Sequence, residues 1–192
     1  WEHDAGLLHL VSDRGWLHRA RPRFEAGHLN GLSPIDSHRL RDADGDPLEG
    51  SAADAESLSL RHAANGKLGD TEYWISFERD HRLQRFRPDG TPLAPPVRPE
   101  AAADAAANKG MEAMTRHPEH GLILGLESPP RGAASKETRL FTLEGQQWRY
   151  PLATPTGSAL TELTRDGDDL LALERAFAPP APLVISLRRV RL

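Results

Sequence analysis

The chain has 192 residues, of which 38% are hydrophobic, and it contains no Cys. The lack of Cys excludes disulfides, thiolate zinc sites and cysteine nucleophiles, and a net charge of −4 from 24 basic and 28 acidic residues gives no electrostatic basis for binding nucleic acid. No run approaches the roughly 20 apolar residues that span a bilayer, so we expect no membrane span. Short apolar runs separated by Gly and Pro favour an all-β fold.

The first predicted strands run over residues 7–14 and 16–20, with Asp13 near the end of the first. A stretch with Gly and Pro follows over 27–50, which we expect to be irregular. Within it, Asp42-Ala43-Asp44-Gly45-Asp46 is similar to a Ca²⁺ loop, but its Gly comes too early and no bidentate Glu follows at the required distance. We therefore predict a turn there.

A hairpin motif with an acidic residue on each strand then recurs three times. The pairs are Glu56 and Glu78, Glu112 and Glu127, and Glu162 and Glu174. Equivalent members lie about 50 residues apart, and such a period with up to four strands per unit is typical of propeller blades. We predict an all-β fold, a partial β-propeller of about four blades of antiparallel strands. It forms one domain over residues 1–192, which we expect to be truncated at both ends.

Further strands are predicted from alternating apolar residues between turn signals. They cover residues 82–87, 138–143, 147–150 and 184–192. The segment 94–108 is rich first in Pro and then in Ala, and we expect a short helix or a mobile loop there.

The innermost strands of a propeller converge on a channel, so equivalent acidic residues would form a ring. Gathered carboxylates repel one another unless a cation or a basic group offsets their charge, and Ca²⁺ accepts several carboxylate oxygens. We therefore expect a Ca²⁺ site. Its candidate ligands are Asp13, Glu56, Glu78, Glu112, Glu127 and Glu174.

Four motifs resemble the bacterial phytase-like family, named for an esterase-like activity of phytase. They are residues 11–15 (VSDRG), 54–58 (DAESL), 108–113 (NKGMEA) and 171–177 (LALERAF). The resemblance covers almost the whole chain, although Ser57 and Ala113 stand where the family commonly has Gly. It implies a β-propeller, usually exported to the periplasm or secreted, whose acidic residues act in phosphoester chemistry.

Two hypotheses of different classes remain open. The first is a metal-assisted phosphoester hydrolase acting on a small phosphorylated substrate, in which acidic residues serve the cation and basic residues bind phosphate. Its candidate catalytic residues are Glu56, Glu112, Glu162, Arg79, Lys109 and Arg175. The second is a non-catalytic propeller that binds a ligand or protein. In that case the Glu side chains accept hydrogen bonds from the backbone of the next blade and hold the blades together.

Other catalytic and metal signals are weak. There is no Gly-x-Ser-x-Gly motif for a serine hydrolase. His117 and His120 have the spacing of metal ligands, but Pro118 between them favours a solvated turn.

Overall fold

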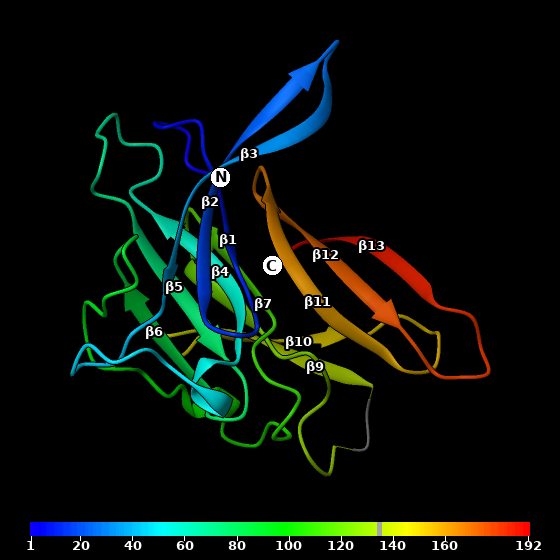
Figure 1. Cartoon of the computed structure of the whole chain (residues 1–192). Helices are drawn as coiled ribbons and strands as arrows, with labels where there is room; N and C mark the ends of the chain where they lie inside the picture. The colour runs from blue at the N-terminus through cyan, green and yellow to red at the C-terminus, as the bar shows by residue number, and fades with distance from the viewer. Residues whose placement is uncertain (134–135) are drawn as a thin grey trace. The chain divides into compact units, whose positions relative to one another are not determined.

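The computed structural model of the chain describes residues 1–133 and 136–192 (Figure 1). Within these residues, thirteen β-strands form four antiparallel sheets, and the helical content is two short 3₁₀ turns, η1 (Gly50–Ala53) and η2 (Glu100–Ala102). The predicted all-β class is confirmed. The short helix expected within 94–108 is η2.

Each sheet is a meander whose strands follow one another in chain order. The first contains β1 (Leu8–Val11), β2 (Trp16–Glu25) and β3 (His28–Arg39), and the second contains β4 (Ala55–Arg61), β5 (Glu72–Phe77) and β6 (Arg82–Phe86). The third contains β7 (Ala113–His117), β8 (Gly121–Gly125), β9 (Glu137–Thr142) and β10 (Gln147–Pro151), and the fourth contains β11 (Ser158–Asp166), β12 (Asp169–Ala176) and β13 (Val184–Val190). The strands expected over 82–87, 138–143, 147–150 and 184–192 are thus present.

The contacts divide the chain into two compact units. The first unit contains Trp1–Ser76 and Leu83–Val97, and the second contains Phe77–Arg82 and Arg98–Leu192. The turn between β5 and β6 therefore belongs to the second unit.

The prediction of an irregular stretch over 27–50 is wrong for residues 28–39, which form β3. Gly31 and Pro34 suggested a break in the strand. Pro34 instead lies where the pairing of β2 and β3 shifts, between Arg19 and Ala20, and such a bulge tolerates a residue without an N–H donor. The guanidinium of Arg23 packs against Gly31, so close that an added Cβ would lie 2.6 Å from its Nη2.

A turn was predicted over Asp42–Asp46, and the structure contains one. The Asp42 carboxylate accepts hydrogen bonds from the N–H groups of Asp44 at 3.0 Å and Asp46 at 2.9 Å. This carboxylate therefore stabilises its own loop, as Asp commonly does in turns.

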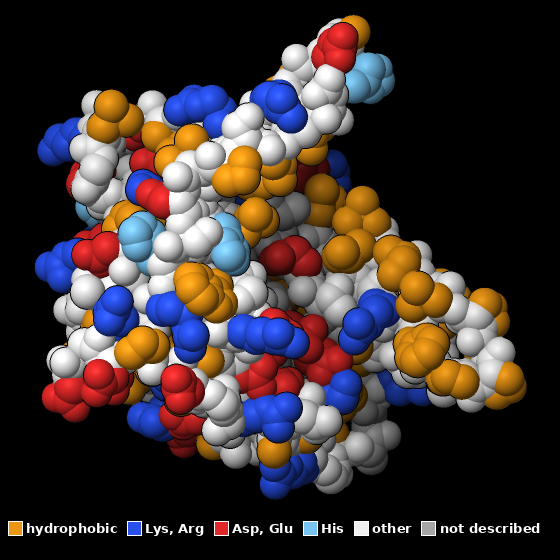
Figure 2. Space-filling view, viewed as in Figure 1, with side chains coloured by type: hydrophobic (Ala, Val, Ile, Leu, Met, Phe, Trp, Pro, Cys, Tyr) orange, Lys and Arg blue, Asp and Glu red, His pale blue; other side chains and the backbone are white. Residues whose placement is uncertain are grey.

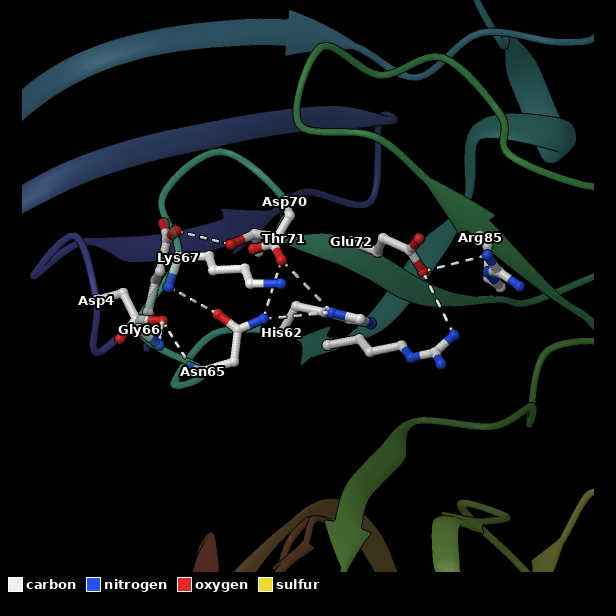
Figure 3. A network of polar contacts seen from close by, with 11 residues as sticks. Asp4, His62, Asn65, Gly66, Lys67, Asp70, Thr71, Glu72 and Arg85 are labelled. Atoms are coloured by element: carbon white, nitrogen blue, oxygen red, sulfur yellow. Dashed lines mark hydrogen bonds and ion pairs between the residues drawn. The ribbon is translucent and has the colours of Figure 1, made fainter.

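A polar network joins the N-terminal segment of the first unit to the loop between β4 and β5 (Figure 3). Asp4 Oδ2 accepts hydrogen bonds from the N–H groups of Asn65, at 2.8 Å, and Gly66, at 3.1 Å. The Asn65 amide donates to Asp70 at 2.9 Å. These contacts fix a loop that carries no secondary structure of its own.

A second network of the first unit is buried. His9 contacts the Tyr73 hydroxyl at 2.6 Å and Glu2 Oε2 at 2.8 Å, and Thr71 donates to the other Glu2 oxygen at 2.7 Å. Burial lowers the pKa of His9 although Glu2 opposes this shift, and burial also raises the pKa of Tyr73. Because Tyr73 is 1% exposed, the network is structural and offers no approach to a substrate.

In the second unit, the third and fourth sheets share an apolar core. Its buried side chains are Ala113, Ile123, Leu140, Tyr150, Leu160, Leu163, Leu170 and Ala172. Alternate residues of β12 point into the core, as strand geometry requires, and the intervening Leu173 lies on the outer face beside Ile185 and Leu187 of β13. Hydrophobic side chains on this sheet are visible at the surface (Figure 2).

We expect Gly125→Ala to lower the free energy of unfolding by about 1–3 kcal/mol, because a Cβ there would lie 2.5 Å from Leu160 Cδ2 and 3.0 Å from Leu140 Cδ2. Urea unfolding measures the change. Leu160→Ala removes one of the overlapping methyl groups, so the double variant should lose less stability than the sum of the two single variants. Additive losses would contradict this packing.

Candidate metal site

Three of the predicted acidic residues meet in the second unit. Glu78 directly follows β5, Glu112 directly precedes β7, and Glu127 lies two residues after β8. Each offers a carboxylate oxygen, and the three oxygens lie within 4.8 Å of one another. Glu78 and Glu127 are buried and Glu112 is half-buried. We call Glu78, Glu112 and Glu127 the carboxylate group.

The backbone of Gly110 holds two members of this group in place. Its N–H donates to Glu78 Oε1 at 3.2 Å, and its carbonyl accepts the N–H of Glu127 at 3.0 Å. Glu112 follows two residues later on the same segment. The short segment that leads into β7 therefore connects the ends of two other strands.

Glu127 has one satisfied oxygen and one that lacks a partner. Lys109 Nζ donates to Oε1 at 2.7 Å, whereas Oε2 is buried without a hydrogen-bond partner among the described residues. The side chain is 2% exposed. A buried carboxylate oxygen with no partner is costly, since it loses its hydration and gains nothing in return.

These residues fit a hard divalent cation. Three close carboxylates repel one another unless positive charge lies among them, and Lys109 supplies one such charge at Glu127. Carboxylate oxygens are the ligands that Ca²⁺ and related cations prefer. A bound cation would also give Glu127 Oε2 the partner that it lacks.

A surface hollow of about 270 Å³ is lined in part by Arg79, His81 and Arg98. Arg79 directly follows Glu78 in the sequence. Arg98 is engaged by Asp80, with hydrogen bonds of 3.0 and 2.8 Å. Arg79 is exposed and has φ of 61°, a left-handed conformation that is uncommon outside Gly. Its N–H donates to the Ala107 carbonyl at 3.1 Å, which holds this turn in place.

The family model described as "Phytase-like: Esterase-like activity of phytase" matches residues 1–192, the whole chain. The chain belongs to the phytase-like family. No curated protein matches it.

Other predicted residues of this phytase-like chain lie elsewhere. Glu174, in β12, is 1% exposed, and its carboxylate accepts hydrogen bonds from the Tyr150 hydroxyl at 2.6 Å, the Ala153 N–H at 2.7 Å and Arg188 at 2.8 Å. Arg175 is exposed on the opposite face of β12. Both oxygens of Glu174 are thus occupied by protein donors, and its role as a metal ligand stays a prediction.

Glu162 lies at a bulge in β11, where the pairing with β12 shifts. Its carboxylate accepts a hydrogen bond from the Leu163 N–H at 2.9 Å and another from the Met114 N–H. The contact with Met114 links the fourth sheet to the third, as expected if Glu residues hold neighbouring sheets together. A catalytic role for Glu162 stays a prediction.

Two predicted ligands belong to the first unit. Glu56 is half-buried in β4. Asp13 is exposed in the turn after β1 and lines a hollow with Trp16 and Arg39, whose guanidinium lies 5.2 Å from the Trp16 ring centre. The metal and catalytic roles of Glu56 and Asp13 stay predictions.

The expectation of a solvated turn at His117 is wrong. His117 ends β7, is 5% exposed and contacts the Asp168 carbonyl at 3.1 Å through Nε2, while its Nδ1 accepts the Glu119 N–H at 3.2 Å. His120 stacks on it with ring centres 4.8 Å apart. Both nitrogens of His117 are therefore used by the backbone.

Sequence reasoning missed Gly110 as the anchor of the carboxylate group, although it stands in the motif Lys109-Gly110-Met111-Glu112. Within the described residues, no helix has the length and apolar character needed to cross a membrane.

Glu162→Gln should change the pH dependence of stability. Desolvation of the carboxyl raises the pKa of Glu162 although two backbone N–H groups oppose this shift. The native chain then retains a proton that the unfolded chain loses, so the stabilisation is complete below the ordinary Glu pKa and is lost as pH rises through the raised value. In urea unfolding, the variant should gain stability relative to wild type as the pH rises above the ordinary Glu pKa, and because Glu162 is exposed, solvent screening keeps this gain small. A difference independent of pH would contradict this.

Proposed function

We propose that the chain is a metal-assisted phosphoester hydrolase. The observation that carries this proposal is the carboxylate group, with its buried and unpartnered Glu127 oxygen, in a chain of the phytase-like family. Glu78, Glu112 and Glu127 hold a divalent cation, for which Ca²⁺ is the first candidate because all three ligands are carboxylates. The bound cation would polarise a phosphoryl oxygen.

Basic residues near the carboxylate group supply the anion-binding part of the site. Lys109 orients Glu127 through their 2.7 Å contact. Arg79, the residue after Glu78, lines the surface hollow described above, and a guanidinium there can bind a phosphate with two hydrogen bonds. The substrate that this arrangement favours is a small phosphorylated molecule.

We further propose that the four meander sheets are blades of one partial β-propeller domain. Four sheets in chain order, each of three or four antiparallel strands, support this arrangement. The family resemblance also favours a periplasmic or secreted protein.

A non-catalytic binding propeller is the second candidate. It is favoured by Glu174 and Glu162, whose carboxylates accept hydrogen bonds from protein groups. In this case the repeated Glu residues stabilise the sheets, and the surface binds a ligand without chemistry.

Hydrolysis assays separate the two candidates. The chain is incubated with p-nitrophenyl phosphate, bis(p-nitrophenyl) phosphate and phytate, with CaCl₂ or with EDTA. We expect cation-dependent hydrolysis of at least one substrate and a loss of at least about tenfold in Glu112→Ala. Glu119→Ala, which removes an exposed Glu from the turn after β7, is the matched control. Hydrolysis that is absent, or unchanged by EDTA and by Glu112→Ala, would favour the binding module.

A further inference from the structure

The first unit contains a hollow of about 400 Å³, formed by the turn after β1, the end of β3 and η1. Its volume lies within the range of roughly 300–1,000 Å³ that is usual for small-molecule sites. The lining includes Asp13, Arg14, Trp16, Arg39 and Glu49. The hollow is therefore large enough for a small ligand, and the proposed metal site does not use these residues.

Backbone contacts hold the walls of this hollow in place. Ser12 Oγ accepts the N–H of Trp16 at 3.3 Å, and the Gly15 carbonyl accepts the N–H of Leu40 at 2.8 Å, which joins the turn after β1 to the end of β3. A Cβ added to Gly15 would lie 3.0 Å from Ala53 Cβ, so the turn packs directly against η1. The hollow is thus formed without a ligand, as small-molecule sites usually are.

Two acidic and two basic residues line the hollow, and none of them is paired with another. Among the described residues, no ion pair joins Asp13 or Glu49 to Arg14 or Arg39. Arg39 Nη2 donates to the Leu48 carbonyl at 2.5 Å, whereas its Nε is buried without a hydrogen-bond partner in the described part of the chain. Acceptors and donors of hydrogen bonds therefore surround the hollow in equal numbers of charged groups.

Trp16 adds an aromatic surface to these polar groups. Its side chain is 37% exposed, and the Arg39 guanidinium lies 5.2 Å from its ring centre. An exposed indole offers a large apolar contact area at one edge of a polar hollow.

We propose that this hollow binds a saccharide. Sugar hydroxyls both donate and accept hydrogen bonds, so they can donate to the carboxylates of Asp13 and Glu49 and accept from the guanidinium of Arg14. The apolar C–H face of a sugar ring packs on the indole of Trp16. Because two positive and two negative side chains offset each other, a charged ligand gains no net attraction from the lining. This binding function goes beyond the proposed hydrolase and does not depend on it.

Affinity electrophoresis of the whole chain in native gels that contain dextran, mannan, xylan or hydroxyethyl cellulose tests this proposal. We expect at least one of these neutral polysaccharides to retard the wild-type chain, and Trp16→Ala to weaken the binding by at least about tenfold. Trp148→Ala, which alters a Trp of the third sheet that lines another hollow, is the matched control and should not change the mobility. Unretarded migration of the wild type in every gel, or a loss of retardation in Trp148→Ala alone, would overturn the proposal.

Two exposed residues provide variants with little risk of misfolding. Arg14→Ala and Glu49→Ala each remove one polar partner of the sugar and should weaken the binding by about two- to tenfold. Retardation that is unchanged in both variants would show that the polysaccharide binds elsewhere.

Calorimetric titration with sodium phosphate tests the class of ligand. We expect no phosphate binding that depends on Arg14, because the acidic residues offset the basic ones. Phosphate binding that is lost in Arg14→Ala would instead assign the hollow to anions and overturn the proposal of a neutral sugar.

Discussion

Glu127→Gln will weaken the binding of a divalent cation by on the order of a hundredfold. The substitution keeps the size of the side chain but removes its charge, and Oε2 of Glu127 is the buried oxygen that lacks a hydrogen-bond partner among the described residues. Lys109 also loses its ion pair, but it is 40% exposed and can turn to solvent. Calorimetric titration with CaCl₂ measures the loss.

Stability without the cation should change in the opposite direction. Glu127→Gln relieves repulsion from Glu78 and Glu112, so the metal-free variant should be at least as stable as the wild type. The stabilisation that added cation gives to the wild type should be lost. An unchanged cation affinity in Glu127→Gln, with Glu119→Gln as control, would show that the carboxylate group is not the site.

Glu174→Ala should show the opposite combination of effects, with little change in cation affinity but a lower stability. It should lower the free energy of unfolding by about 2–3 kcal/mol. The buried Tyr150 hydroxyl, the Ala153 N–H and Arg188 all lose their acceptor. Arg188 is 36% exposed, so water can hydrate its guanidinium when the carboxylate is removed. The loss of stability therefore stays below that for a fully buried ion pair. Urea unfolding measures the change.

Cation binding provides the contrast between the two Glu residues. The carboxylate oxygens of Glu174 are occupied by protein donors, so Glu174→Ala should change the Ca²⁺ affinity by less than about twofold. Tyr150→Phe removes one of the same hydrogen bonds and should cost about 1 kcal/mol. A large loss of cation affinity with little loss of stability in Glu174→Ala would mean that this Glu belongs to a metal site.

Much of the strand pattern could be predicted from the sequence because short apolar runs and turn residues are local signals. β6, β9 and β10 lie where these signals placed them. β3 was missed because Gly31 and Pro34 are normally strand breakers. A bulge beside Pro34 and the packing of the Arg23 side chain against Gly31 compensate for both residues.

The candidate site was predictable only in part. The repeat identified Glu78, Glu112 and Glu127, but it identified Glu174 by the same rule. Glu174 differs because Tyr150 and Arg188 reach its carboxylate, and these residues lie 24 and 14 positions away in the sequence. The contacts of Gly110 with Glu78 and Glu127 likewise join residues that are distant in sequence. Such contacts arise from the packing of sheets, which a motif does not encode.

The most direct test of the account is anomalous diffraction from crystals of the chain soaked in MnCl₂. We predict an anomalous difference peak within bonding distance of carboxylate oxygens from Glu78, Glu112 and Glu127. A map with no peak at this position, or with peaks only at other acidic residues such as Asp13, would contradict the central claim that these three residues form a metal site.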